Sequence, residues 1–278
     1  MSEIVEIQGQ YYILARSSVA DVAARVLKHG ETFAIFDRHG DIRPLGFETQ
    51  GIFHEGMRFV SRIKLEMNGK SPLLLSSNVK EDNDLLVADL TNPDLAASDG
   101  TVVRSGNIHL VRTVFLWEGR CFERTEISNF GLDRVEFALS FAFQADFVDL
   151  FEVRGSKREK RGRLLEPQMV PDGIVLRYEG LDTLLRRTEF KFGQAAQQIS
   201  SERAVFSIAL DPQERVTLDL RVTCWSGPEE PKPKPCDVAF QEMHAAYEAQ
   251  RADVPCMESS NEQFNDWLFQ SRADLHML

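Results

Sequence analysis

Residues 36–78, FDRHGDIRPLGFETQGIFHEGMRFVSRIKLEMNGKSPLLLSSN, contain the clearest β-hairpin signal in the sequence. From Phe59 to Met67 apolar side chains alternate with polar ones, which is typical of a strand with one buried face. Asn68-Gly69 follows, and both residues tolerate the positive φ of a type I′ turn. Residues 70–76 are therefore predicted to return antiparallel to the first strand, and Pro72 favours an edge position for them.

The chain up to Trp225 continues with short alternating segments separated by turn residues. Segments 107–117 and 121–127 are predicted to pair across Glu118-Gly119, and residues 135–144 place an aromatic-rich face on one side of a strand. Further strands are predicted at 11–15, 85–90, 174–178, 184–192, 204–210 and 216–225. Together these patterns predict an all-β fold, a large two-sheet antiparallel β-sandwich of more than ten strands.

The composition changes after Trp225. Residues 226–237, SGPEEPKPKPCD, are rich in proline and charge and predict an extended connector. Residues 238–251 then show helical spacing of Phe240, Met243 or His244, and Tyr247, and Ser259-x-x-Glu262 is a capping-box pattern before a second helix. We therefore expect a sandwich domain at 1–225, a linker at 226–237 and a helical segment at 238–278.

Composition excludes several classes of protein. The 278 residues carry a formal charge of −11 with a pI of about 5.1, so we expect no nucleic-acid partner. No segment has the length and apolar character of a signal peptide or a membrane span, so we expect a soluble cytoplasmic protein. Cys121, Cys224, Cys236 and Cys256 show no metal-type spacing and are interpreted as reduced packing residues.

Several segments resemble, in the same order, the N-terminal domain of bacterial glycogen-debranching, amylo-α-1,6-glucosidase-like proteins. These segments are FDRHGDI, GIFHEGMRFVSRIKLEMNGKSPLLLSSNVKEDN, DLTNP, FQADFVDLFEVRG (143–155) and YEGLDTLLRRTEFKF (178–192). One departure lies at Gly56-Met57, where many members carry Asp-Thr before the arginine matched by Arg58. A role that depends on that acidic residue is therefore not expected here.

The resemblance implies a supersandwich-like domain that precedes a catalytic (α/α)6 barrel, with residues 238–278 as the start of a truncated barrel. The parent protein would be a glycoside hydrolase of carbohydrate metabolism, and this chain alone would be non-catalytic, without a cofactor. Three alternatives remain open: a stand-alone carbohydrate-binding module for α-glucans, a sandwich enzyme of the mutarotase type, and a family member with a different substrate or none.

Asp146, Asp149 and Glu152 are the densest group of carboxylates, and glycosidic hydrolysis generally uses a pair of carboxyl groups. On a regular strand Asp146 and Glu152 would share one face and Asp149 would lie on the other, with Arg154 as the nearest cation. We interpret Arg58, Asp146, Asp149, Glu152 and Arg154 as substrate-contact or domain-interface residues and expect no catalytic residue in this chain.

Three other features leave alternatives open. Residues 154–163, RGSKREKRGR, form a basic loop that is either solvated or binds an acidic surface or ligand. Trp117, Tyr178 and Trp225 are able to stack on sugar rings if exposed, although strand aromatics are more often packed. His54 and His109 lie near strands, but no histidine pattern indicates a metal site.

The predicted second helix places four apolar side chains on one side: Phe264, Trp267, Leu268 and Leu275. Burial of such side chains is worth roughly 1.5–3 kcal/mol each, so this stripe requires a partner. In the related proteins the barrel would cover it. For this chain the pattern favours a homodimer formed through residues 259–278.

Overall fold

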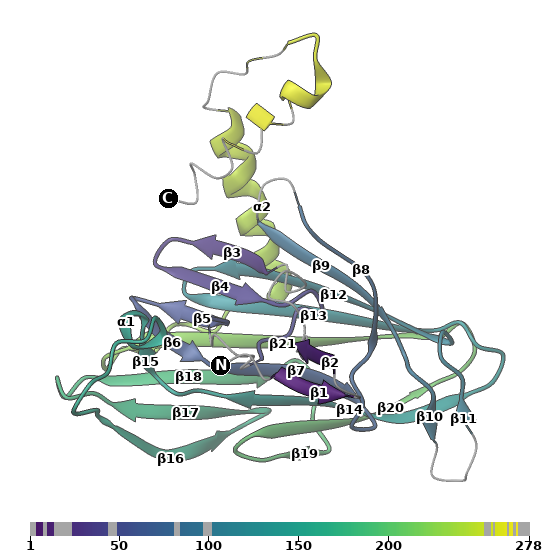
Figure 1. Cartoon of the computed structure of the whole chain (residues 1–278), viewed down its shortest axis with the longest axis horizontal. Coiled ribbons are helices and arrows are strands. Elements are labelled where there is room, and N and C mark those ends of the chain that lie inside the picture. The colour runs from purple at the N-terminus through teal and green to yellow at the C-terminus, as the bar shows by residue number, and fades with distance from the viewer. Residues whose placement is uncertain are drawn as a thin grey trace.

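The computed structural model describes residues 4–7, 10–13, 24–43, 49–80, 84–96, 102–252, 257, 259–265, 267–268 and 271. Strands dominate this part of the chain, and all of their pairings are antiparallel. They form the sandwich shown in Figure 1, which confirms the predicted all-β fold.

One layer is a single eight-stranded sheet with the order β16-β17-β18-β21-β13-β12-β9-β8. Its strands are β8 (Leu73–Val79), β9 (Leu85–Thr91), β12 (Ile108–Trp117), β13 (Arg120–Asn129), β16 (Arg163–Val170), β17 (Gly173–Glu179), β18 (Leu185–Phe192) and β21 (Arg215–Ser226).

The facing layer is divided into two sheets. The four-stranded sheet, ordered β19-β20-β14-β7, contains β7 (Arg62–Met67), β14 (Val135–Gln144), β19 (Gln198–Ile199) and β20 (Arg203–Leu210). The five-stranded sheet, ordered β15-β6-β5-β4-β3, contains β3 (Arg25–His29), β4 (Thr32–Phe36), β5 (Gly51–His54), β6 (Met57–Val60) and β15 (Val148–Asp149). Two small pairs, β1 (Ile4–Ile7) with β2 (Gln10–Ile13) and β10 (Leu95–Ala96) with β11 (Val102–Val103), complete the strands.

The turn at Asn68-Gly69 forms as predicted, with φ of 46° and 75°, but the predicted hairpin around it is wrong. β7 pairs with β14, whereas β8 crosses to the other layer and pairs with β9. Asn68 also contacts β14, since its side chain accepts a hydrogen bond from the backbone N–H of Ala138 (2.7 Å), next to β7's partner residues. The edge position indicated by Pro72 is confirmed, since β8 ends the eight-stranded sheet.

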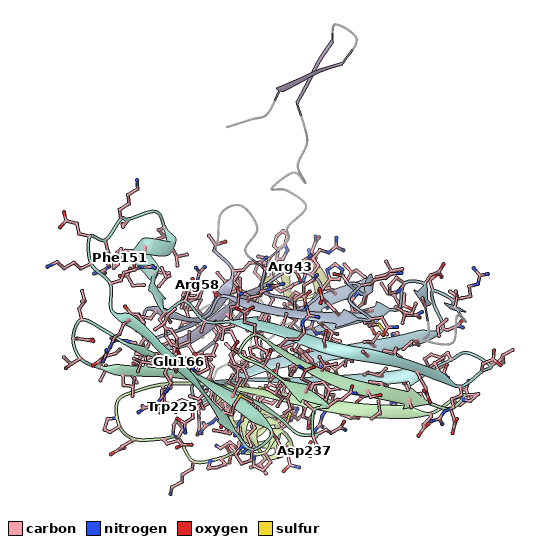
Figure 2. The ribbon with its side chains drawn as sticks, turned by 90° about the horizontal axis from the view of Figure 1, so that it is seen from below. Arg43, Arg58, Phe151, Glu166, Trp225 and Asp237 are labelled. Atoms are coloured by element: carbon pink, nitrogen blue, oxygen red, sulfur yellow. The ribbon has the colours of Figure 1, made fainter. Side chains whose placement is uncertain are left out.

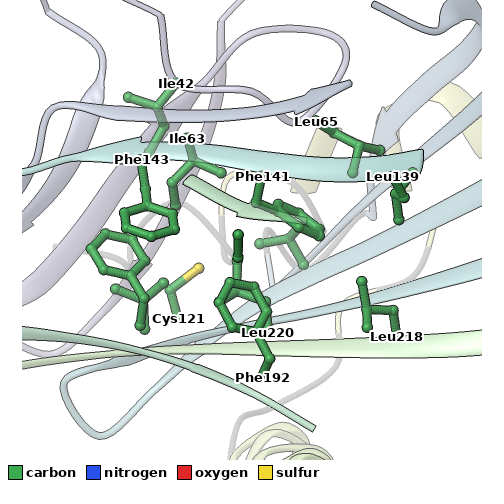
Figure 3. Packing of buried hydrophobic residues seen from close by; sticks show 14 of the residues in the cluster. Ile42, Ile63, Leu65, Cys121, Leu139, Phe141, Phe143, Phe192, Leu218 and Leu220 are labelled. Carbon is green, nitrogen blue, oxygen red and sulfur yellow. The ribbon is translucent and has the colours of Figure 1, made fainter. Parts of the chain in front are cut away.

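The predicted pairing of residues 107–117 with 121–127 is confirmed as β12 and β13, joined at Glu118 (φ 47°) and Gly119 (φ 73°). The predicted aromatic face of β14 is also confirmed, and it packs between the layers. Figure 3 shows β7 and β14 side chains facing Cys121, Phe192, Leu218 and Leu220 of the eight-stranded sheet. The Phe143 ring stacks on Phe190 with their centroids 4.5 Å apart.

A charged cluster that the sequence analysis missed lies inside this core. The fully buried Arg112 forms ion pairs with Asp41 (2.6 Å) and Glu123 (2.8 Å). Its remaining N–H groups donate to the carbonyl oxygens of His39 and Gly40 and to the second carboxylate oxygen of Glu123. The guanidinium thus ties the Asp37–Asp41 turn to β12 and β13.

Helix α2 (Cys236–Ala252) covers part of the outer face of the eight-stranded sheet, beside β9 and β12 (Figure 1). Ala239 and Met243 are buried there against Leu85, Phe115 and Phe122, while Phe240 touches the Phe115 ring at the edge of the contact. The predicted first helix is confirmed. Of its predicted apolar positions, Met243 is buried and Tyr247 packs against the same cluster, whereas Phe240 and His244 are exposed.

The segment between β21 and α2 is attached to the sheet by its backbone. Arg120 donates to the carbonyl oxygen of Lys232 (2.8 Å), and Arg221 donates to that of Lys234 (3.1 Å). Beyond α2, residues 262–265, 267–268 and 271 are helical. Asn261, not Ser259, caps this second segment, because its side chain accepts a hydrogen bond from the Phe264 N–H (3.2 Å).

Candidate functional site

The candidate site begins where β14 ends and the chain turns into a short helix. Phe147 has a φ of 50°, a left-handed conformation that is unusual for a bulky residue. It is held there by packing, since its ring stacks on Tyr178 with centroids 5.4 Å apart and meets Phe59 edge to face. Strained backbone of this kind persists only where surrounding contacts determine it, and it is frequent at functional sites.

This turn brings two of the predicted carboxylates together. Asp149 is the N-cap of α1 (Leu150–Val153), and its Oδ1 accepts hydrogen bonds from the N–H groups of Phe151 (2.8 Å) and Glu152 (3.0 Å). The alternation expected for a regular strand is wrong here, because the left-handed Phe147 interrupts the strand and only the two residues of β15 separate it from helix α1.

Arginines of the basic loop bind these carboxylates. Arg158 forms an ion pair with Asp149, and Arg161 donates to Glu152 Oε1 (2.8 Å). The partner of Asp149 is therefore Arg158 and not the predicted Arg154, which is exposed at the C-cap of α1. The sequence analysis did not consider this arrangement for residues 154–163, in which two arginines of the loop bind carboxylates of the same chain.

Arg58 and Asp146 form a separate pair behind this turn. Arg58 is buried, and its Nε donates to Asp146 Oδ1 (3.1 Å) while Nη1 donates to the Gln50 carbonyl oxygen (3.3 Å). Gly51 permits this, because a Cβ at that position would lie 2.6 Å from Arg58 Cδ. Arg58, which the family resemblance singled out, is thus a buried residue that holds Asp146 next to the turn.

A cavity of about 300 Å³ opens beside α1, at the end of the sandwich where Figure 2 shows Phe151 at the tip and Arg58 further in. We call it the end pocket. Its walls come from β6, the α1 turn, the basic loop, and the turn between β17 and β18. The lining residues are Met57, Phe147, Asp149, Glu152, Arg158, Lys160, Arg161, Gly162, Tyr178, Gly180, Leu181, Asp182 and Arg186.

Charges in the end pocket are arranged mostly as pairs. Besides the two carboxylates of the α1 turn, Asp182 accepts hydrogen bonds from both terminal nitrogens of Arg186 (3.0 and 2.8 Å). The hydrogen bond from Arg186 lowers the pKa of Asp182 to about 2. Tyr178 is fixed as well, since its hydroxyl accepts a hydrogen bond from the Gly162 N–H (2.8 Å).

The aromatic residues considered for sugar stacking are packed, as strand aromatics usually are. Tyr178 and Trp225 are buried, and Arg187 covers the Trp225 ring at 5.7 Å. Trp117 packs against His29 and donates to Glu242 (3.1 Å). Phe151 is instead the exposed aromatic side chain of this end, with 65% of its surface accessible.

The histidines and cysteines singled out in the sequence have ordinary surroundings among the residues that the structure describes. His54 shares a hydrogen bond with Thr32 Oγ1 (2.8 Å), and burial lowers its pKa, while His109 lies 3.3 Å from Asp89. Cys121, Cys224 and Cys236 are free thiols, and Cys256 lies outside the described residues.

No helix in the described ranges has the length and apolar character that crossing a bilayer requires.

Fold and site together define an antiparallel β-sandwich domain with a charged pocket at one end and a helix on its outer face. The chain belongs to the family described as the N-terminal domain of some glycogen debranching enzymes, whose model matches residues 27–221. This finding confirms the resemblance seen in the sequence. No curated protein matches the chain.

One solved structure supports the fold, and two others with lower scores are also similar. A protein assigned as a kojibiose phosphorylase from the human microbiome is similar with a TM-score of 0.54 at 10% identity, over 93% of this chain and 36% of that one. This chain therefore spans about a third of that protein. An aldose 1-epimerase-like protein from Escherichia coli K12 (TM-score 0.40, 9% identity) and a galactose mutarotase-like protein from Lactobacillus casei (0.40, 10%) each match 73% of this chain, over 99% and 100% of their own lengths.

Proposed function

We propose that this chain is the non-catalytic N-terminal domain of a cytoplasmic glycogen-debranching, amylo-α-1,6-glucosidase-like protein, and that it supports a catalytic (α/α)6 barrel. Family membership over residues 27–221 is the basis of the assignment to debranching-type proteins. Arg58, Asp146, Asp149, Glu152 and Arg154 then belong to the end of the sandwich that contacts the barrel or its substrate.

The non-catalytic role rests on one observation: each of the three predicted carboxylates is bound by an arginine of this chain. Asp146 is bound by Arg58, Asp149 caps α1 and pairs with Arg158, and Glu152 accepts from Arg161. A catalytic carboxyl group must be able to reach the glycosidic bond, whereas each of these three groups is already bound to an arginine of the same chain. These carboxylates therefore suit a structural role better than glycosidic hydrolysis.

An activity assay on the purified chain tests this proposal. We expect no release of glucose from α-1,6-linked oligosaccharides, at protein concentrations where a debranching enzyme would consume the substrate. Asp149→Asn and Glu152→Gln serve as matched variants. Glucose release that either variant abolishes would overturn the non-catalytic role, because it would place the chemistry on this turn.

The alternative of an α-glucan-binding module has one observation in its favour. The end pocket is concave and combines polar pairs with the apolar surface of Met57, Phe147, Tyr178 and Leu181. The mutarotase-type alternative would require a histidine and a carboxylate converging in one concave face, and none of the described residues that line the end pocket is a histidine.

A further inference from the structure

Three buried polar atoms on the outer face of the eight-stranded sheet have no hydrogen-bond partner among the residues that the structure describes. They are Arg221 Nε, Thr223 Oγ1 and Trp225 Nε1, at alternate positions of β21, and we call them the β21 donor cluster. Val222 and Cys224, which lie between them in the sequence, belong to the core between the layers, so the three side chains share the opposite face. Buried polar groups are almost always hydrogen-bonded, and this cluster therefore calls for a partner from outside the chain.

We propose that the β21 donor cluster binds a small inorganic monoanion of the halide class. An indole N–H and a guanidinium N–H are donors only, and a threonine hydroxyl rotates to donate, so all three groups are able to direct a hydrogen at one acceptor. A water molecule would accept some of these hydrogen bonds but would need acceptors for its own two hydrogens. A halide ion accepts from several sides and donates nothing, which matches a cluster made of donors.

Thr223 occupies the centre of the proposed site. Antiparallel pairing places Arg120 of β13 directly opposite Thr223 on one side and Glu189 of β18 on the other. Arg221 and Trp225 lie two residues before and after it, about 7 Å away along the strand. Only 4% of the Thr223 surface and 8% of the Trp225 surface are accessible, so an ion bound between them would be shielded from solvent.

The connector between β21 and α2 lies over this end of β21. Arg120 and Arg221 donate to its backbone carbonyl oxygens, as described above, and Arg187 Nη1 donates to the carbonyl oxygen of Gly227 (2.6 Å). The Arg187 guanidinium also lies over the Trp225 ring, 5.7 Å from its centroid. Three arginines thus surround the cluster and are held there by backbone carbonyl groups.

The charge next to Thr223 is positive. Glu189 is the carboxylate directly opposite it, and Arg221 Nη2 already binds Glu189 (3.0 Å). Arg187 forms no ion pair with any residue in the described ranges. Burial lowers the pKa of Arg120, so neighbouring carboxylates compensate its charge incompletely.

The wider surface around the cluster leaves one positive charge. Lys234 of the connector lies between Glu118 and Glu242, and its Nζ donates to Glu118 Oε2 (2.7 Å). With the three arginines and Glu189, this gives four basic and three acidic side chains. A single negative charge balances them, which favours a monoanion over a phosphate dianion.

Chlorine-35 NMR on the full chain tests the proposal in solution. We expect an excess chloride linewidth that bromide displaces saturably and that gluconate at the same ionic strength does not change. Thr223→Val removes the hydroxyl and keeps the side-chain shape, and Trp225→Phe removes the indole donor. Each variant should weaken chloride binding by roughly tenfold or more, as expected for the loss of one hydrogen bond to a charged group.

Thr217→Val is the matched control, because Thr217 lies six residues earlier on the same strand and on the same face of the sheet. It should leave the chloride affinity unchanged, and circular dichroism should show that all three variants fold. Anomalous diffraction from crystals grown in bromide provides a measurement that needs no variant. It should place a bromide ion in contact with Thr223 Oγ1.

Three results would overturn the proposal: no chloride linewidth that bromide displaces, equal losses in Thr217→Val and Thr223→Val, or a water molecule instead of bromide beside Thr223 in the crystals. Each of them leaves the proposed non-catalytic role intact, because that role is decided by glucose release.

Discussion

Among single residues, Arg112 has the largest consequences for stability. It is the largest fully buried side chain in the described part of the chain, and it is surrounded by two carboxylates and two carbonyl oxygens. Burial opposes its charged form, but Glu123 and Asp41 outweigh this and raise its pKa. Removing one partner of such a cluster leaves uncompensated buried charge, which is costly.

Arg112→Met should therefore destabilise the protein by about 3–5 kcal/mol, the range for a broken buried ion pair. Urea unfolding followed by tryptophan fluorescence measures this change. Arg134→Met is the control, since Arg134 pairs with Glu136 and Asp211 at the surface and should change stability by less than about 1 kcal/mol. Similar losses in both variants would mean that the buried cluster has no special role.

Asp41 makes stability depend on pH. Burial raises its pKa from the ordinary 3.8 to about 6, although Arg112 acts in the opposite direction. The folded protein thus binds this proton more tightly than the unfolded chain does. The resulting stabilisation is complete below about pH 4 and is lost as the pH rises through about 6.

The Asp41→Asn variant tests the direction of this pH dependence of stability, because it removes the titrating group and keeps the side-chain shape. The unfolding free energy of the natural protein relative to this variant should fall between pH 4 and 6.5 and then remain constant. A relative stability that rises over this interval would show that Asp41 is ionised in the folded protein throughout.

At the scale of secondary-structure elements, α2 depends on a small contact with the outer face of the sheet. Met243 and Ala239 are its buried residues against Leu85, Phe115 and Phe122, and Arg124 on β13 pairs with Asp237 in its first turn. The large core between the layers does not include α2. The helix should therefore detach without unfolding the sandwich.

Met243→Ala should release α2 selectively, because truncation of a buried methionine costs about 2–5 kcal/mol. Hydrogen exchange with mass spectrometry should then show loss of protection in 236–252 and little change in β12–β14. His244→Ala, on the exposed side of the same helix, should have no such effect. Uniform loss of protection in both regions would instead show that helix and sandwich unfold together.

For the whole molecule, the predicted association through residues 259–278 remains a prediction. Phe264 and Trp267 are 47% and 64% exposed, and Leu275 lies outside the described residues. Light scattering should show a dimer for the full chain and a monomer after deletion of 259–278. A monomeric full chain, or a dimer unchanged by the deletion, would exclude this surface as the interface.

Local patterns were sufficient to predict most strands of the sandwich, the turns at Asn68 and Glu118, and the first C-terminal helix, but not β3, β5 or β16. These features depend on side-chain alternation and on residues that tolerate positive φ, and a short segment of sequence is enough to recognise both. The partner of each strand depends instead on contacts between distant segments. For this reason β7 pairs with β14 rather than with β8. Met67 of β7, for example, lies opposite Leu139 of β14, 72 residues further along the chain.

The candidate site was likewise predictable only in part from the sequence. Composition alone pointed to Asp149, Glu152 and the basic loop, because charges clustered in sequence remain close in space. Only the tertiary structure brought Tyr178, Leu181 and Asp182 to the same pocket, replaced Arg154 by Arg158 as the partner of Asp149, and buried Arg112 between two carboxylates. The physical reason is that the packing of whole sheets decides which charged side chains pair and which residues line a cavity. The residues next to each other in the chain do not contain this information.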